Sequence, residues 1–406
     1  MHGCDEDGDR RVEAALTELR RGRMVLVIDD EERENEGDLV MAAESTTPEA
    51  MAFFIRHTSG LVCVAIDEER ADQLQLPLMV AAGDDPRGTA FTVSVDRKGA
   101  TTTGISAADR TATVRALVDP ATKPADLSRP GHVFPLRARR GGVLRRAGHT
   151  ESAVDLCTLA GLRPAGMLCE VVNDDGTVAR RPQLARFAMD HGLVSITVAD
   201  IVRYRQRTEK LVTREAAGRV PTDHGTFTAI TFRDIVGDIE HVAFVLGDID
   251  RPGEPILTRV HSECLTGDIF GSRRCDCGPQ LNTAMARIGE AGRGAVVYLR
   301  GHEGRGIGLS HKLRAYTLQD AGLDTVDANL AQGLPIDSRE YGIGAQILDD
   351  LGIRQVRLMT NNPGKYHGLS GYGIHIVARE PLIIPPTSES AAYLTAKRTR
   401  LHHVLD

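Results

Sequence analysis

Apolar residues recur along the first half of the chain with two periods, one typical of helices and the other of strands. Val12, Ala15, Leu16 and Leu19 lie on one face of a predicted helix, and the apolar run at 24–29 predicts a buried strand. The same patterns predict four further elements: a helix that begins at Thr47-Pro48-Glu49 and continues to Gly60, an amphipathic helix at 151–161, and strands at 61–66 and 167–172. Helices that alternate with strands are typical of α/β and α+β domains.

The second half of the chain shows a similar alternation. It predicts paired strands at 228–235 and 241–249, an apolar segment at 256–265 that leads into a cysteine cluster, a helix at 279–292 and a strand at 294–301. Between the halves, Tyr204 to Val220 is rich in charge and poor in core residues, so we expect a linker there. With 406 residues, the chain is long enough for two domains that each bury a core. We expect domains at 1–206 and 207–406, each a mixed β-sheet packed with helices (α+β or α/β).

Composition and charge narrow the possible functions. Hydrophobic residues make up 41% of the chain and charged residues 26%, which is typical of a soluble globular protein. Aromatic residues make up only 4%, Trp is absent and the net charge is −7, so we expect no surface for nucleic acid. This balance favours small phosphorylated substrates that local Arg and Lys side chains bind.

Neither a targeting segment nor a membrane segment is expected. The first eleven residues are polar and acidic, without the apolar stretch of a signal peptide, and the longest apolar runs are too short to cross a bilayer. The seven cysteines are an odd number, and three of them lie within fourteen residues. We therefore expect a cytoplasmic protein whose thiols bind metal and do not form a disulfide framework.

An acidic loop follows the strand predicted at 24–29. Seven carboxylates surround the single Arg33: those of Asp29, Asp30, Glu31, Glu32, Glu34, Glu36 and Asp38. Such a run is ordinarily a solvated surface turn. Its place at the end of a buried strand, and the tight turn expected at Gly37-Asp38, favour a site for a hard cation such as Mg²⁺, which prefers oxygen ligands.

Three other polar positions in the first half are candidates for chemistry. Residues 145–150 open a helix, and with Thr150 as the cap and Arg146 beside it this N-terminus predicts an anion site. His149 is then available to a metal or for acid–base catalysis. A lone histidine such as His132 is more often packed or hydrogen-bonded than catalytic. Glu170 lies in an apolar strand, where a charge is costly unless it is paired, and this favours a site.

Five motifs in the first half carry a resemblance to a known family. They are RENEGD (33–38), TTGISAADR (102–110), RPGHVFPL (129–136), RAGHTESAVDL (146–156) and CEVV (169–172). In this order, over roughly residues 10 to 200, the chain resembles 3,4-dihydroxy-2-butanone 4-phosphate synthase. Each motif alone is weak, but five in sequence are specific.

The resemblance implies a reaction and the residues for it. The family converts D-ribulose 5-phosphate to L-3,4-dihydroxy-2-butanone 4-phosphate and formate, with Mg²⁺ or Mn²⁺. Glu34 and His149 then stand where the family has metal ligands, and His132 and Glu170 where it has residues essential for catalysis. The residues implied to contact the substrate and its phosphate are Arg33, Glu34, Asp38, Arg146, Ala147, Gly148, His149, Thr150 and Glu170.

Cys264, Cys275 and Cys277 form a second constellation, in the second half of the chain. Three thiolates without an obvious fourth ligand favour a catalytic zinc with an open position, because structural zinc sites usually have four protein ligands. The alternative is a structural zinc completed by His261 or another histidine. A glycine-rich stretch at 301–308 opens a helix; it either cradles phosphates or is a plain turn, and it is not a Walker loop.

The second half also resembles a known family. Beside the cysteine motif at 259–280, the strings LQDAGLDTVDANL (318–330), GLPIDSREYGIGAQIL (333–348) and MTNNPGKYHGL (359–369) are similar to those of GTP cyclohydrolase II, over roughly residues 207 to 400. That family hydrolyses GTP to 2,5-diamino-6-(5-phosphoribosylamino)pyrimidin-4(3H)-one, formate and pyrophosphate. The resemblance implies Zn²⁺ on the three cysteines and Mg²⁺ accompanying GTP.

The resemblance also assigns roles to single residues. Asp337 is implied as the proton acceptor and Arg339 as a nucleophile toward the α-phosphate, although a guanidinium stabilises charge more readily than it attacks phosphorus. Tyr316 matches a family tyrosine near the base. The residues implied to bind GTP are Arg259, Val260, His261, Ser262, Glu263, Gln280, Glu303, Gly304, Arg305, Thr325, Thr360 and Lys365. Both families imply a homodimer.

The main hypothesis is therefore a bifunctional enzyme that makes two riboflavin precursors. Two alternatives stay open at this point. In one, the first half is an inactive structural partner of the zinc hydrolase. In the other, the chain is a zinc-stabilised nucleic-acid-binding or regulatory protein that uses GTP as a signal, although the acidic net charge and scarce aromatics disfavour it.

Overall fold

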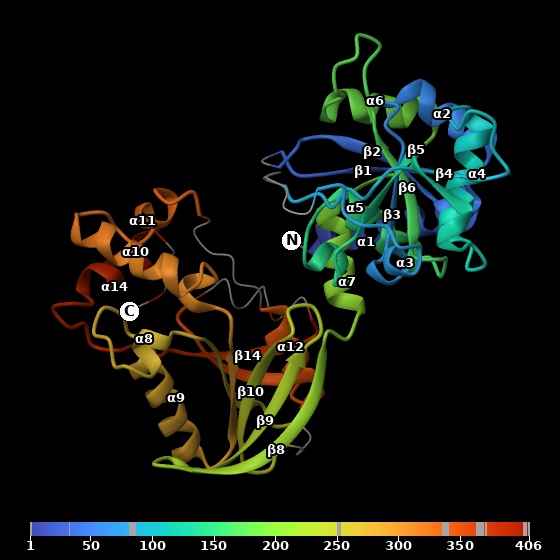
Figure 1. Cartoon of the computed structure of the whole chain (residues 1–406). Helices are drawn as coiled ribbons and strands as arrows, with labels where there is room; N and C mark the ends of the chain where they lie inside the picture. The colour runs from blue at the N-terminus through green and yellow to red at the C-terminus, as the bar shows by residue number, and fades with distance from the viewer. Residues whose placement is uncertain are drawn as a thin grey trace. The chain divides into compact units, whose positions relative to one another are not determined.

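The computed structural model (Figure 1) describes residues 2–31, 33–80, 87–249, 253–334, 341–362, 369, 372–400 and 404, without the side chains of residues 2–6 and 392. The chain divides into two compact units, Met1–Thr208 and Glu209–Asp406. Each unit contains a seven-stranded sheet with helices around it, so the predicted mixed α+β architecture is confirmed.

The sheet of the first unit mixes parallel and antiparallel pairs. Its strands are β1 (Val25–Ile28), β2 (Gly37–Ala42), β3 (Cys63–Ile66), β4 (Val95–Arg97), β5 (Leu127–Arg137), β6 (Ala165–Glu170) and β7 (Ser195–Thr197). They lie in the order β4-β5-β3-β6-β2-β1-β7. The pairs β3–β5 and β1–β7 are parallel and the others antiparallel. The strands predicted at 24–29, 61–66 and 167–172 are confirmed.

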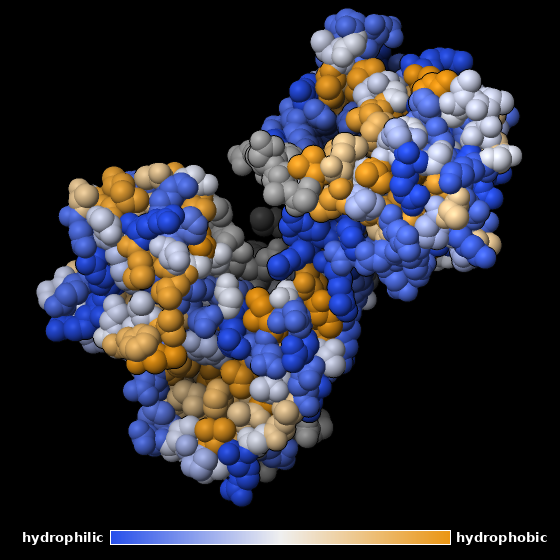
Figure 2. Space-filling view, in the orientation of Figure 1, coloured by the Kyte–Doolittle hydropathy of each residue, from blue (hydrophilic) through white to orange (hydrophobic). Residues whose placement is uncertain are grey.

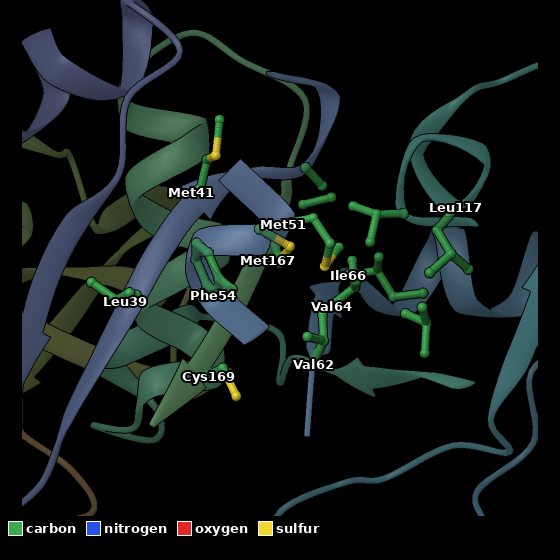
Figure 3. Close-up of a cluster of buried hydrophobic side chains, with 14 of the residues drawn as sticks. Leu39, Met41, Met51, Phe54, Val62, Val64, Ile66, Leu117, Met167 and Cys169 are labelled. Atoms are coloured by element: carbon green, nitrogen blue, oxygen red, sulfur yellow. The ribbon is translucent and has the colours of Figure 1, made fainter. Parts of the chain in front are cut away.

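Helices cover both faces of this sheet. They are α1 (His2–Arg20), α2 (Pro48–His57), α3 (Glu68–Gln73), α4 (Ala107–Val118), α5 (His149–Leu159), α6 (Arg181–His191) and α7 (Val198–Thr208), with short 3-10 turns η1 (Ala43–Ser45), η2 (Pro124–Asp126) and η3 (Gly142–Leu144). Because strand residues alternate between faces, Leu26 packs in a core with α2, α4 and α6, whereas Val27 packs in a second core with α1, α5 and α7. Figure 3 shows part of the first core, where Met51 and Phe54 of α2 lie against the sheet.

The predicted helix starts and faces are largely confirmed. The side chain of Thr47 caps α2 by accepting a hydrogen bond from the backbone N–H of Ala50. The amphipathic character predicted for 151–161 was wrong, because every residue of α5 from His149 to Cys157 is buried. This helix contacts the sheet as well as α1 and α7, so its polar side chains make hydrogen bonds inside the unit.

The linker predicted between Tyr204 and Val220 was also wrong. α7 continues to Thr208, and the strand β8 (Val212–Thr222) already belongs to the second sheet. β8 is an edge strand that pairs with β9 alone, and most of its side chains are exposed. An exposed edge strand has the polar, charged composition that makes it look like a linker.

The second unit has a sheet with an antiparallel and a parallel half. Its strands are β8, β9 (Gly225–Asp234), β10 (Ile239–Leu246), β11 (Ile256–Ser262), β12 (Gly294–Leu299), β13 (Gln355–Met359) and β14 (His375–Glu380). Their order is β14-β13-β11-β12-β10-β9-β8. Neighbours from β8 to β12 pair antiparallel, and those from β12 through β11 and β13 to β14 pair parallel. The strand pair and the strand predicted after the cysteine cluster are confirmed.

The helices of the second unit are α8 (Leu265–Asp268), α9 (Cys277–Ala291), α10 (Leu309–Asp320), α11 (Asp327–Leu330), α12 (Gly342–Asp350) and α14 (Ala391–Arg400), with the turn η4 (Glu303–Arg305). The helix predicted at 279–292 corresponds to α9. α12 and α9 pack in two different cores of the unit. Figure 1 shows α10, α11 and α14 gathered on one side of the unit.

The parallel half of this sheet fixes where a site can form. The loops that follow β11, β12 and β13 leave the same edge of the sheet, and in open α/β sheets ligands bind at that edge. These loops contain the cysteine cluster, the glycine-rich stretch and the segment 360–362.

None of the described helices has the length and apolarity needed to cross a membrane. On the face seen in Figure 2, apolar groups gather near α8. Ile269 and Phe270, which directly follow α8, are 68% and 73% exposed.

Candidate functional sites

The acidic loop of the first unit joins two paired strands. Gly37 and Asp38 were expected to form a tight turn, but they begin β2, because the pairing of β1 with β2 extends to Ile28 and Gly37. The buried carboxylate of Asp29 accepts hydrogen bonds from the backbone N–H groups of Glu34 (3.1 Å) and Glu36 (2.9 Å). It also pairs with Arg33 at 2.9 Å. Asp29 therefore sets the shape of the loop.

This loop places Glu34 beside His149. Ligand atoms of Asp29, Glu34 and His149 all lie within 4.8 Å of one another. Nδ1 of His149 lies 3.8 Å from a carboxylate oxygen of Glu34 and 3.7 Å from one of Asp38. Its buried Nε2 has no hydrogen-bond partner among the residues that the structure describes. A buried imidazole surrounded by carboxylates fits a divalent cation.

The charges of this cluster depend on one another. The interaction with the His149 imidazole, helped by Arg33, lowers the pKa of Glu34 to about 2. Burial raises the pKa of Asp38 to about 7. Burial lowers the pKa of His149, but Asp38 and Glu34 outweigh it and raise that pKa to about 9. A cation that binds to His149 therefore displaces a proton from it.

The N-terminus of α5 lies next to this cluster. The predicted cap was wrong: Gly148 is the N-cap, and Thr150 is already inside the helix. A Cβ on Gly148 would lie 2.4 Å from Nη1 of Arg146 and 3.0 Å from Nη2 of Arg33, so glycine allows two guanidinium groups to approach the helix end. Arg146 is held by Glu151 at 2.6 Å and by Thr89 at 2.9 Å. Two guanidinium groups beside the N-terminus of a helix favour the binding of an anion.

Strand register brings the other predicted residues to this end of the sheet. Asp38 of β2 pairs directly with Glu170 of β6. Cys63 of β3 pairs with Leu168, two residues before Glu170, and with Phe134, two residues after His132. Because side chains alternate with period two, Asp38, Glu170 and His132 share one face of the sheet. It is the face that α5 covers.

The catalytic candidates have partners that sequence reasoning missed. Asp96 accepts a hydrogen bond from the backbone N–H of His132 (2.9 Å), and its other oxygen lies 2.7 Å from the ring Nδ1. A Cβ on Gly104 would lie 2.2 Å from Asp96 and 2.5 Å from His132, so the glycine of the TTGISAADR motif makes room for this pair. Ser59 donates to the carboxylate of Glu170 at 2.8 Å.

In the second unit the three cysteines meet. Cys264 follows β11, Cys275 lies just before α9 and Cys277 begins it, and the three sulfurs are within 4.8 Å of one another. The sulfurs of Cys264 and Cys275 are 3.7 Å apart. Zn–S bonds of about 2.3 Å in a tetrahedral arrangement place two sulfurs about 3.8 Å apart, so the spacing fits zinc.

The neighbours of the sulfurs are also consistent with a metal centre. A Cβ on Gly267 would lie 2.9 Å from the sulfur of Cys275 and 3.0 Å from that of Cys264. Hydrogen bonds with the two other thiols, together with Lys312, lower the pKa of Cys264. Within the described residues, no histidine joins the three sulfurs. Nε2 of His261 instead lies 3.1 Å from Asp268, which leaves the alternative of a site closed by His261 without support.

Two adjoining cavities open at this centre. One encloses about 660 Å³, open solvent included, and is lined by the three cysteines and by residues of α10 and α11. The other encloses about 530 Å³, open solvent included, and is lined by three cations, Arg259, Arg305 and Lys397, and by the polar residues 360–362. Ser262, Cys277, Arg305 and Tyr393 line both. The first cavity has room for a flat ring beside the cysteines, and the cations of the second favour an anion.

Most of the residues predicted to bind GTP line these cavities. Those in the first are Ser262, Glu263, Gly304, Arg305 and Thr325, and those in the second are Arg259, His261, Ser262, Gln280, Arg305 and Thr360. The side chain of Val260 lies in the core, and Glu303 is buried against Lys312. Tyr316 lines the first cavity with Arg274 4.9 Å above its ring. Asp337, Arg339 and Lys365 lie outside the described residues.

Sequence reasoning missed three residues in the cavity walls. Lys312 of α10 lines the first cavity, and Tyr393 and Lys397 come from α14 near the end of the chain. Lys397 donates to Asp276 at 2.6 Å, between two of the cysteines in sequence. Lys312 and Lys397 are 9% and 8% exposed, and burial of this kind is not visible as a sequence motif.

Comparisons with known proteins match the two halves of the chain to two different families. Residues 13–204 match the sequence model of 3,4-dihydroxy-2-butanone 4-phosphate synthase, and residues 213–381 match that of GTP cyclohydrolase II. The chain is 59% identical to the riboflavin biosynthesis protein RibBA of Salinispora arenicola, over 97% of this chain and 94% of the relative. It is 58% identical to the bifunctional riboflavin biosynthesis protein RIBA 1, chloroplastic, of Arabidopsis thaliana, over 98% of this chain and 73% of the relative.

A solved structure resembles nearly the whole chain. RibBX, a two-domain 3,4-dihydroxy-2-butanone 4-phosphate synthase from A. baumannii, superposes with a TM-score of 0.68 at 36% sequence identity. The match covers 90% of this chain and 99% of that chain.

Proposed function

The chain belongs to the RibBA family of bifunctional riboflavin biosynthesis proteins, and from that premise we propose which residues carry each of its two reactions. Its first half is a 3,4-dihydroxy-2-butanone 4-phosphate synthase, which converts D-ribulose 5-phosphate to L-3,4-dihydroxy-2-butanone 4-phosphate and formate. Its second half is a GTP cyclohydrolase II, which hydrolyses GTP to a diaminopyrimidine ribosyl phosphate, formate and pyrophosphate.

In the first site, the sugar phosphate binds across the N-terminus of α5. Its phosphate lies between Arg146 and the backbone N–H groups of His149 and Thr150, while Arg33 and Asp38 bind the hydroxyl groups of the sugar. Glu34 and His149 hold Mg²⁺ or Mn²⁺, which when bound stabilises negative charge on the oxygen atoms of the sugar. The close approach of two guanidinium groups at Gly148 supports this placement.

His132 and Glu170 move the protons of this reaction. Asp96 fixes the orientation and the tautomer of His132, so that the other ring nitrogen exchanges a proton with the substrate. Glu170, on the same face of the sheet, transfers another proton. The observation that carries this proposal is the strand register, which places Asp38, Glu170 and His132 on the face beside His149.

The substitution Asp96→Asn tests this assignment of His132. We expect kcat for formate release from ribulose 5-phosphate to fall by about 100-fold or more, with a smaller change in KM, because proton transfer contributes about 10²- to 10⁴-fold. Asp190→Asn, which removes an exposed carboxylate paired with Arg186, is the matched control. Equal kcat in the two variants would refute the role of Asp96, and no formate from the wild type would mean that the first half is an inactive partner.

In the second site, the three cysteines hold Zn²⁺ and GTP spans both cavities. The guanine ring lies in the first cavity between Tyr316 and the cysteines, and the triphosphate with its Mg²⁺ lies in the second, beside Arg259, Arg305 and Lys397. When bound, the zinc ion supplies the Lewis acid that activates water toward the ring. The sulfur spacing of 3.7 Å carries the zinc assignment. Proton transfer by Asp337 and charge stabilisation by Arg339 stay predictions.

Product analysis separates this proposal from a regulatory role of GTP. The full chain, incubated with GTP and Mg²⁺, is expected to yield the diaminopyrimidine product, formate and pyrophosphate in equal amounts, as identified by mass spectrometry. A protein that used GTP only as a signal would bind it and release it unchanged.

Two properties of the whole protein complete the proposal. We infer a homodimer, because Ile269 and Phe270 are largely exposed apolar side chains next to one another on the second unit. Light scattering that gave the mass of one chain would refute it.

We also place the protein in the cytoplasm, where a reducing environment keeps the metal-binding thiols free.

A further inference from the structure

Lys312 is a buried cation in contact with the cysteine centre. Its side chain belongs to α10 and the residue is 9% exposed. The ammonium lies 3.1 Å from the sulfur of Cys264, 2.8 Å from Oγ1 of Thr266 and 2.5 Å from Oε1 of Glu303. A lysine ammonium has three donors, and all three are used. Lysine is rarely buried unless it is paired, and Lys312 is buried with a partner for every donor.

The partners of Lys312 connect three segments around the centre. Glu303, in η4, accepts from Lys312 with one oxygen and from the backbone N–H of Leu265 with the other, at 2.6 Å. Leu265 follows Cys264 and begins α8. Thr266 also lies 3.3 Å from the hydroxyl of Tyr316. The ammonium therefore joins the glycine-rich stretch and α10 to the turn that carries the first cysteine.

The positive charge of the Lys312 ammonium also affects the electrostatics of the cysteine centre. Three thiolates and the carboxylate of Glu303 carry four negative charges, which one zinc ion balances only by half. GTP is itself strongly anionic, so a centre with excess negative charge repels its substrate. Lys312 is a cation in direct contact with a ligand sulfur, and it also neutralises Glu303. In a buried setting a contact of this kind is much stronger than in water.

We propose that Lys312 is a positioning residue of the zinc centre: its ammonium holds the sulfur of Cys264 in the ligating position, which keeps the metal bound, and draws negative charge from that sulfur, which leaves the metal electron-poor. Lys312 acts through Cys264. The proposal rests on zinc at the three cysteines, and it adds a residue outside the metal ligands on which the properties of the ion depend. Groups that orient metal ligands in this way contribute about 10- to 100-fold to metal affinity.

Zinc affinity of the full-length protein tests the proposal without any measurement of activity. In competition with a chromogenic chelator, Lys312→Met is expected to bind zinc about 10- to 100-fold more weakly than the wild type. Lys312→Arg, which keeps the charge, should recover much of that loss. Lys210→Met is the matched control, because Lys210 is an exposed lysine paired with Asp350 on the same unit, and its zinc affinity should equal that of the wild type.

A spectrum of the cobalt-substituted protein provides the second measurement. Without the ammonium, the lone pairs of the Cys264 sulfur rise in energy, so the thiolate-to-cobalt charge-transfer band of Lys312→Met should move to longer wavelength. Lys312→Arg should keep the band near its wild-type position. Should Lys312→Met fail to fold by circular dichroism, Lys312→Gln takes its place with the same expectations.

The outcomes separate the two proposals. A wild type without zinc would refute the metal assignment of the second site. If the wild type holds zinc but the folded Lys312 variant has the same zinc affinity and an unshifted cobalt band, only the role of Lys312 is overturned.

Discussion

The two proposed metal sites of this chain both lie where strands of a mixed sheet end, yet their ligands are held in opposite ways. In the first unit each expected ligand already has a partner in the protein: Glu34 pairs with Arg33, and His149 lies 3.7 Å from Asp38. In the second unit the sulfurs of Cys264 and Cys275 already have the separation of two ligands on one zinc ion.

This difference predicts two kinds of metal binding. An ion in the first site competes with Arg33 and with the proton on His149, and Mg²⁺ loses its water reluctantly, so we expect weak and exchangeable binding. The second site presents soft ligands that are packed around one point, with a glycine against two of the sulfurs. We expect its ion to remain bound through purification.

The largest expected effect is the loss of one activity without the other. Cys275→Ser removes a sulfur from the three-cysteine centre, and GTP hydrolysis should fall by about 1000-fold or more, to background, because both the ion and its Lewis acidity are lost. Formate release from ribulose 5-phosphate should stay within about twofold of the wild type, since the first unit has its own sheet and core. Parallel loss of both activities would contradict two independent sites.

The reciprocal change in the first site should have a smaller effect. Glu34→Gln keeps the size of the side chain but removes its charge, so the divalent ion loses one ligand while His149 remains. We expect formate release from ribulose 5-phosphate to fall by about 100-fold, with partial recovery at high Mg²⁺, because the weakened site can still be filled by mass action. A variant with the wild-type Mg²⁺ dependence would show that Glu34 does not bind the ion.

A change beside the sulfurs tests how tightly the second site is built. The Cβ of Gly267→Ala would lie 2.9 Å and 3.0 Å from two sulfurs, and we expect about tenfold weaker zinc binding in chelator competition. Gly218→Ala is the matched control, since a Cβ there meets nothing within 4 Å and its φ is not positive. Equal zinc affinity of the two variants would show that the centre tolerates displacement of its sulfurs.

Much of this architecture could be predicted from the sequence. Strands such as 24–29 and the capped helix at Thr47 are local features, because apolar periodicity and capping residues determine them directly. The cluster of the three cysteines was also predictable, because they lie close together in the sequence. β8 was mistaken for a linker because an edge strand has few core contacts to mark it.

The residues that support the sites were harder to predict. Asp96 is separated from His132 by 36 positions, and Lys312 from Cys264 by 48, so no periodic pattern connects them. Lys397 lies beyond the residues that match the GTP cyclohydrolase II family. Such partners meet only when the strands and helices are packed, and a lone Asp or Lys in a sequence is ordinarily a surface residue.

Metal removal followed by assays of both reactions on one sample tests the contrast between the two sites most directly. After dialysis of the full chain against EDTA and removal of the chelator, we predict no formate from ribulose 5-phosphate until Mg²⁺ is added. The same sample should retain about one zinc per chain by elemental analysis and should hydrolyse GTP once Mg²⁺ is supplied, without added zinc. A sample that needs zinc for GTP hydrolysis after this treatment, or that converts ribulose 5-phosphate without a divalent ion, would contradict the account.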